Sequence, residues 1–145
     1  MSLDHSAHLR PNSLAVDIRR FPGIRRLAAD YITNFGVLEP FFSGDPADDA
    51  AWEKAIAART GTPDRHVAIA PVIHTQQRNR RAPAPAIEAT ALLEDPRAVA
   101  VVTGQQAGLF GGPLYTLLKA ISAIRLSRRV QQLHGVPAVA VFWVD

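Results

Sequence analysis

The chain has 145 residues, 48% of them hydrophobic and 20% charged, which suffices for one domain with an apolar core. It contains no cysteine, so a disulfide scaffold, a zinc ribbon and a catalytic thiol within this sequence are excluded. The net charge is only +3, and no run of residues predicts a nucleic-acid arm, a membrane helix or an export signal. We therefore expect a cytoplasmic protein without a nucleic-acid or membrane partner.

The segment 1–95 is predicted to be a helical and irregular N-terminal region. Apolar residues at helical intervals predict a short helix over 24–35, and a second helix is predicted over 49–60. Pro71 is expected to interrupt any continuous helix in the next segment, because proline lacks the N–H that a helix needs. A further short helix is predicted over 86–93.

The segment 96–145 is predicted to be the first βαβ unit of a Rossmann-like core. Residues 98–102, AVAVV, form an apolar run that is typical of a strand buried on both faces. A glycine-rich turn leads into a long helix over 114–134, whose Leu and Ile residues are expected to lie against the sheet and leave one narrow polar stripe in water. Residues 136–145, VPAVAVFWVD, are predicted to be a second buried strand.

These elements predict an α/β fold: the N-terminal part of a Rossmann-like parallel-sheet core, preceded by short helices and irregular segments. Two buried parallel strands need neighbouring strands, and the sequence contains no other convincing strand. We therefore expect the chain to be a truncated part of a longer protein and to be inactive by itself. Asp145 is expected at the carboxyl end of the second strand, where ligands bind in open α/β sheets.

The turn TGQQAGLFGGP, residues 103–113, carries the chemistry that the sequence predicts. A helix N-terminus has unpaired N–H groups and a partial positive charge, and glycines let the backbone approach a phosphate closely. The glycine spacing matches neither a Walker A loop nor the pattern G-x-G-x-x-G. Two interpretations stay open: the turn binds a phosphate or nucleotide, or its glycines only permit a tight crossover.

Seven residues of this turn and the following helix are candidate ligand contacts. The glycines are expected to allow close backbone approach, the glutamines to exchange hydrogen bonds with a ligand, and the tyrosine and lysine to reach toward a phosphate. The structural alternatives are glutamines that satisfy backbone groups, a buried tyrosine and a solvated lysine. No general base and no pair of histidines with metal-ligand spacing is present, so neither a catalytic residue nor a metal site is predicted. The candidates are Gly104, Gln105, Gln106, Gly111, Gly112, Tyr115 and Lys119.

Several stretches of the sequence resemble one known family. VAVVTGQQAGLFGGPLYTLLKAISAI, followed by GVPAVAVFWVD, is similar to the N-terminal part of the bacillithiol-biosynthesis cysteine-adding enzymes. YITNFGVLEPFFSGDP and DPRAVAVVTGQQ match the opening of the same family. The resemblance covers residues 21–145, and its glycine-rich string is long and specific. The segment 65–86 departs from the helix expected there.

The resemblance implies a cytoplasmic ligase that joins the carboxyl group of cysteine to the amine of glucosaminyl-malate through an amide bond. It also implies a homodimer that forms through a coiled coil absent from this sequence. The family core is similar to class I aminoacyl-tRNA synthetases and nucleotidyltransferases, which implies ATP or another adenine nucleotide as cofactor. Those enzymes carry a His-x-Gly-His motif where this chain has Phe110-Gly111-Gly112-Pro113, so the catalytic role of those histidines does not carry over.

Two other functions stay open. One is a nucleotidyltransferase or synthetase relative that acts on another acid, and the other is a non-catalytic module for nucleotide binding or assembly. Amide formation from a carboxylate requires activation, and preorganised N–H groups stabilise the charge that develops on phosphate oxygens. The ligase interpretation agrees with that chemistry.

Overall fold

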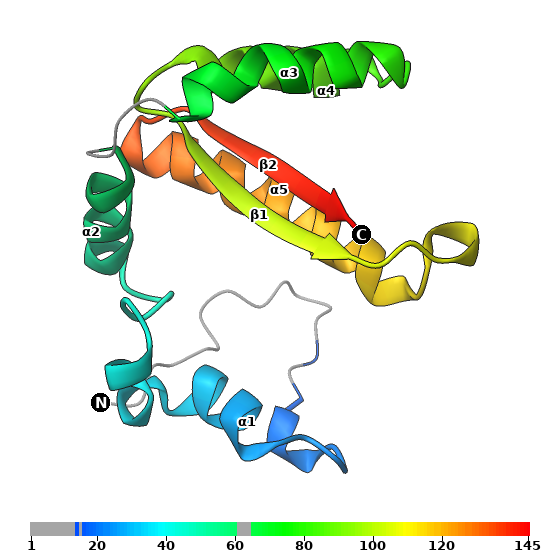
Figure 1. The fold of residues 1–145 in the computed structure, drawn as a ribbon. Helices are drawn as coiled ribbons and strands as arrows, with labels where there is room; N and C mark the ends of the chain where they lie inside the picture. Colours follow the sequence, from blue (N-terminus) through cyan, green and yellow to red (C-terminus); the bar gives the residue numbers. More distant parts are fainter. Residues whose placement is uncertain (1–13, 15, 61–64) are drawn as a thin grey trace. The chain divides into compact units, whose positions relative to one another are not determined.

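The computed structural model describes residues 14, 16–60 and 65–145. The chain divides into two compact units, Met1–Ala51 and Trp52–Asp145, whose helices and strands are labelled in Figure 1. Within the described ranges, no helix is both long and apolar enough to cross a membrane.

Aromatic rings hold the first unit together. α1 (Arg26–Thr33) is followed by short 3-10 turns. The rings of Tyr31, Phe35 and Phe42 lie with their centroids 5.2 to 5.5 Å apart, a spacing at which aromatic pairs attract one another. The helix is shorter than the predicted 24–35 because Phe35 is buried at the start of a 3-10 turn and does not extend α1.

Two more predicted helices are confirmed. α2 (Asp49–Thr60) covers the range predicted for it. α4 (Ala84–Ala91) continues into a 3-10 turn, Leu92–Glu94, and together they cover the helix predicted over 86–93. α4 carries Pro85 in its first turn, where a proline costs no helical hydrogen bond.

Pro71 does not break its helix, so that prediction is wrong. α3 (Arg65–Asn79) runs through this proline, and the departure from helix expected over 65–86 is confined to the turn at 80–83. Pro71 is exposed whereas the preceding Ala70 is buried. Pro71 has no N–H to donate to the carbonyl oxygen of Val67, four residues earlier, and water can take the place of that donor on an exposed side of the helix. The burial of Ala70 in the core outweighs the loss of this one hydrogen bond.

The core of the second unit lies where α3, α4 and the start of the sheet meet. Ala70, Leu93 and Val139 are buried there, and Ile73, Ala89 and Val141 pack against them. Figure 1 shows α3 and α4 side by side next to the start of the two strands. Every member of this core is apolar, so burial of apolar surface stabilises the arrangement.

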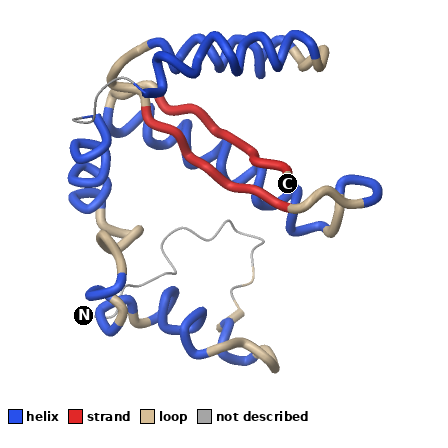
Figure 2. The backbone as a smooth tube through the Cα atoms, in the orientation of Figure 1, coloured by secondary structure: helices blue, strands red, loops and turns tan. Residues whose placement is uncertain are grey.

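The predicted βαβ unit is confirmed. β1 (Val99–Gln105) and β2 (Ala138–Val144) pair in parallel along their whole length, and α5 (Leu114–His134) joins them. Figure 2 shows α5 running along the strands, and it contacts both of them. α5 ends at Gly135, which has a left-handed conformation with φ +64°, as is usual for a glycine that follows a helix.

β1 is longer than the strand predicted over 98–102. It continues to Gln105, and the backbone pairing extends one step further. The N–H of Asp145 donates to the carbonyl oxygen of Gln105 at 3.4 Å, and the N–H of Ala107 donates to the carbonyl oxygen of Asp145 at 3.0 Å. Residues 106–113 connect β1 to α5, and the first of them still lie beside the end of β2.

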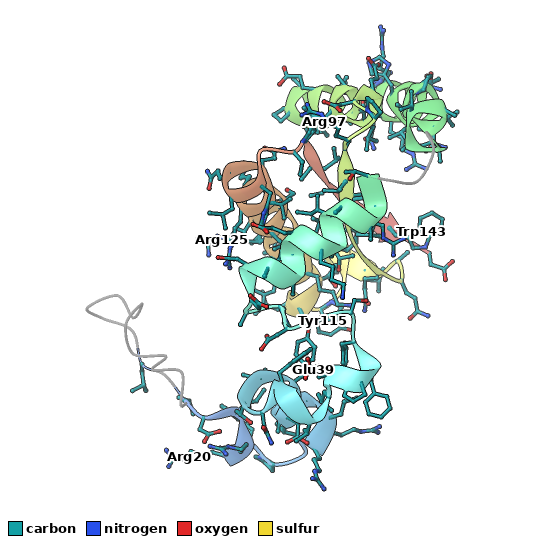
Figure 3. The ribbon with its side chains drawn as sticks, turned by 90° about the vertical axis from the view of Figure 1, so that its left-hand side faces the viewer. Arg20, Glu39, Arg97, Tyr115, Arg125 and Trp143 are labelled. Carbon is teal, nitrogen blue, oxygen red and sulfur yellow. The ribbon has the colours of Figure 1, made fainter. Side chains whose placement is uncertain are left out.

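The prediction that both strands are buried on both faces is wrong near their carboxyl ends. α5 contacts one face of the sheet, and Val139 on the other face belongs to the core. Val102 and Trp143 are 65% and 66% exposed, and Trp143 projects away from α5 (Figure 3). Among the described residues the sheet has two strands, and this end of the face that points away from α5 stays open to solvent.

α5 also differs from its prediction, because it turns small residues toward the sheet. Ala123, Ser127 and Val130 are its buried residues, at the spacing of one helix face. Small side chains let a helix approach a sheet closely, and many of the larger apolar side chains of α5 stay exposed. The exposed leucine and isoleucine residues of α5 are Leu114, Leu117, Leu118, Ile121, Ile124 and Leu133.

Candidate functional site

A pocket of about 690 Å³ lies beside the loop 106–113, which follows the carboxyl end of β1 (Figure 2). This volume is in the range of small-molecule sites. The walls come from the loop, the end of β2 and the first turns of α5. None of the lining residues is charged, so a charged ligand would depend on neutral hydrogen-bond donors. The side chains that line it include Gln105, Gln106, Thr116, Leu117, Phe142 and Val144.

The loop 106–113 takes its shape from two left-handed glycines. Gly111 and Gly112 have φ of +86° and +81°, a region that other residues enter only at a cost. The N–H of Gly111 donates to the carbonyl oxygen of Gly108 at 3.2 Å, and the N–H of Gly112 donates to that of Leu109 at 3.0 Å. Both N–H groups are therefore engaged within the loop, and what these glycines offer a ligand is the absence of a Cβ. Their contact with a ligand stays a prediction.

The first turn of α5 supplies the available donors. Pro113 precedes the helix and no side chain caps it. Among the described residues, the N–H groups of Leu114 and Tyr115 have no acceptor, and N–H groups at this position carry the partial positive charge of the helix. Neutral donors of this kind can stabilise an anion in a site without charged side chains.

A buried hydroxyl group at the pocket lacks a partner. Oγ1 of Thr116 is shielded from solvent and has no hydrogen bond within the described part of the chain, and Thr116 lines the pocket. A Cβ on Gly112 would lie 3.1 Å from this oxygen. Because a buried polar group without a partner costs free energy, this hydroxyl favours a polar ligand atom at the same wall.

Gly104 has a structural reason to be glycine. It belongs to β1 and pairs with Trp143 of β2. A Cβ at this position would lie 2.7 Å from the carbonyl oxygen of Trp143 and 3.0 Å from its Cβ. The missing side chain thus lets the two strands approach, and Gly104 is not among the residues that line the pocket.

Gln105, Tyr115 and Lys119 form one hydrogen-bond network at the end of β1. Nε2 of Gln105 donates to Oη of Tyr115 at 2.7 Å. Nζ of Lys119 donates to the carbonyl oxygen of Gly104 at 3.1 Å and to Oε1 of Gln105 at 3.3 Å, and it lies 5.4 Å from the centre of the Tyr115 ring. The lysine thus binds groups of its own chain and fixes the direction of the Gln105 amide.

Six of the seven predicted contacts lie in two places, and Gly104 lines neither of them. Gln105, Gln106, Gly111 and Gly112 line the 690 Å³ pocket. Tyr115 and Lys119 line a separate groove of about 370 Å³ along β1, and Gln105 connects the two places through its hydrogen bonds. Figure 3 labels Tyr115 at the start of α5.

Replacement of Lys119 by Met in the full-length protein is expected to lower the free energy of unfolding by about 1 kcal/mol, because two hydrogen bonds to the end of β1 are lost. The matched control is Arg128→Met, an exposed basic residue of the same helix. Thermal unfolding of both variants compares the two losses. Equal midpoints for the two variants would show that the network does not stabilise the strand end.

Thr116 was not singled out by the sequence, although helical spacing contains the signal. Thr116 and Ala120, four residues apart, line the pocket, whereas Tyr115 and Lys119 line the groove. A helix of 3.6 residues per turn separates these two pairs onto different faces. The sequence does not show which of these two helix faces lines the pocket.

Asp145 directly follows β2, at the carboxyl end where it was predicted. It is exposed and does not line the pocket. Its backbone, not its carboxylate, joins it to the end of β1. Within the ranges that the structure describes, no three His, Asp or Glu side chains come together in a way that could hold a metal ion.

Comparisons with a family model and with known proteins identify the same family. A family model described as "Bacillithiol biosynthesis BshC, N-terminal Rossmann-like domain" matches residues 14–145. A protein of Geobacillus thermodenitrificans (strain NG80-2) named "Putative cysteine ligase BshC" is 40% identical over 124 residues, which make up 85% of this chain and 23% of that protein. A protein of Heliobacterium modesticaldum (strain ATCC 51547 / Ice1) with the same name is 54% identical over 52 residues, 36% of this chain and 10% of that protein. The chain thus spans less than a quarter of the length of these relatives.

Proposed function

The chain belongs to the bacillithiol biosynthesis BshC family, and we propose that the full-length protein is a cysteine ligase. It forms an amide bond between the carboxyl group of cysteine and the amine of glucosaminyl-malate. The relatives that carry the name cysteine ligase support the class of reaction. The observation that supports a binding site in this chain is the pocket at the N-terminus of α5, with its two free N–H groups and the unpartnered hydroxyl of Thr116.

ATP or another adenine nucleotide supplies the activation of the carboxylate in this proposal. The chain's own residues bind and orient it. The N–H groups of Leu114 and Tyr115 and the hydroxyl of Thr116 donate to phosphate oxygens, and Gly111 and Gly112 leave room for the phosphate. The apolar walls exclude water, which strengthens these hydrogen bonds and limits hydrolysis of an activated acid.

The remaining parts of the proposal concern the whole protein. The ligase acts in the cytoplasm on small-molecule substrates, and two subunits pair through a coiled coil. Size-exclusion chromatography with light scattering on the full-length protein tests the second point, since it should report twice the mass of one chain.

Deletion of the gene tests the reaction. We expect bacillithiol to disappear and glucosaminyl-malate to accumulate, and expression of the wild-type protein to reverse both changes. Normal bacillithiol in the deletion strain would contradict the ligase proposal. If the purified protein bound ATP while bacillithiol stayed normal, the function would instead be that of a relative acting on another acid or of a nucleotide-binding module.

A further inference from the structure

The loop 106–113 carries two large apolar side chains at its tip. Leu109 is 88% exposed and Phe110 is 105% exposed, so water surrounds both of them. Phe110 also has φ +54°, a left-handed conformation that residues with a Cβ enter at a cost. Both the exposure of the Phe110 ring to water and its backbone conformation are unfavourable in free energy. A contact of the ring with a bound ligand would offset part of this free energy.

Phe110 stands at the rim of the pocket described above and is one of its lining residues. The wall contributed by the strand and helix is apolar too, through Leu117, Phe142 and Val144. The donors, in contrast, lie together at the first turn of α5, with the hydroxyl of Thr116. The pocket thus has a polar end that suits phosphate oxygens and an apolar remainder that suits an uncharged part of the same ligand.

The volume shows that a phosphate group alone does not fill this space. A pocket of about 690 Å³ is of the size that holds a whole small molecule and not a single anion. An apolar region next to an anion site accommodates a ring system or a hydrocarbon chain. A flat aromatic ring makes the larger favourable contact with a phenylalanine side chain, because two π systems can stack.

We propose, on the basis of the proposed function, that Phe110 contacts the base of the nucleotide while the phosphates bind at the N-terminus of α5. The ring of Phe110 covers one face of the base, and the apolar wall lies on the other side. Gly108, Gly111 and Gly112 flank the loop tip and allow the small backbone change that brings the ring over the ligand. The ligand class is therefore a nucleoside phosphate, recognised by its base as well as by its phosphates.

Isothermal titration of the full-length protein with ATP and with inorganic tripolyphosphate tests this proposal. We expect wild type to bind ATP more tightly than tripolyphosphate. Phe110→Ala should weaken ATP binding by about 10-fold or more, since stacking on an aromatic side chain contributes that much per base, and should leave tripolyphosphate binding unchanged. Phe110→Tyr keeps the ring and should retain wild-type affinity for both probes. Leu109→Ala, at the neighbouring exposed position, is the matched control.

The outcomes separate this proposal from the one on which it rests. Equal loss of affinity for ATP and tripolyphosphate in Phe110→Ala would overturn the base contact, as would wild-type affinity for ATP in that variant. If wild type bound tripolyphosphate and ATP equally well, the phosphate site would stand and the contact with the base would be wrong. If wild type bound neither probe, the nucleotide part of the proposed function would fail together with this inference.

Discussion

Replacement of Gly111 by Val in the full-length protein is expected to remove detectable ATP binding and bacillithiol production. Gly111 has φ +86° and open space where a Cβ would stand, so the obstacle is the backbone conformation and not a clash. A β-branched residue does not tolerate this conformation. The loop must therefore rearrange, which displaces Gly112 and the start of α5, where the free N–H groups lie. Calorimetry with ATP and the bacillithiol content of cells measure the two effects.

Gly111→Asn is the matched control for that variant. Asparagine adopts left-handed conformations more readily than other residues with a Cβ, and the open space accommodates its side chain. We expect this variant to keep most of the ATP affinity. Wild-type ATP binding and bacillithiol output in Gly111→Val would show that the conformation of this loop is irrelevant to the ligand.

A second large effect is expected from Gly104→Ala. The added Cβ would lie 2.7 Å from the carbonyl oxygen of Trp143, closer than real Cβ contacts, and both atoms belong to paired strands that cannot move independently. Overpacking of this kind costs about 1–3 kcal/mol. The full-length variant should therefore unfold at a clearly lower temperature than wild type.

Gly36→Ala adds the same atom at a position with no heavy atom within 4 Å and without a positive φ. It should unfold close to the wild-type temperature. A Gly104→Ala variant as stable as Gly36→Ala would show that β1 and β2 lie further apart at this point than the structure has them.

Much of the fold follows from the order of apolar runs and turn residues. The apolar strand before the glycine-rich turn and the Gly-Val-Pro after α5 predicted the βαβ unit, because they mark strand and helix limits without tertiary information. The end of β1 was missed since Gly104 resembles a turn residue in the sequence, while in the structure it is a site of close strand approach. The sequence alone also overstates the effect of Pro71, because the cost of a proline within a helix depends on whether its face of the helix meets water.

Ligand binding at the glycine-rich turn stays a prediction, and the structure adds the arrangement of the residues around it. The glycine-rich turn indicated the end of β1 and the start of α5, where the pocket lies. The sequence could not tell that Lys119 is held by Gly104 and Gln105, since that depends on the side of β1 that α5 packs against. Nor could it show that the N–H groups of the left-handed glycines are used within the loop, which shifts the available donors to the helix itself.

Amide hydrogen exchange of the full-length protein, with and without saturating ATP, tests most directly whether the loop 106–113 and the first turn of α5 hold an anionic ligand. Bound phosphates should accept hydrogen bonds from the N–H groups of Leu114 and Tyr115 and slow their exchange. We predict slower exchange in peptides that cover residues 106–117 and no change in those that cover 128–134, at the far end of the same helix. Unchanged exchange over 106–117 at saturating ATP would contradict the account.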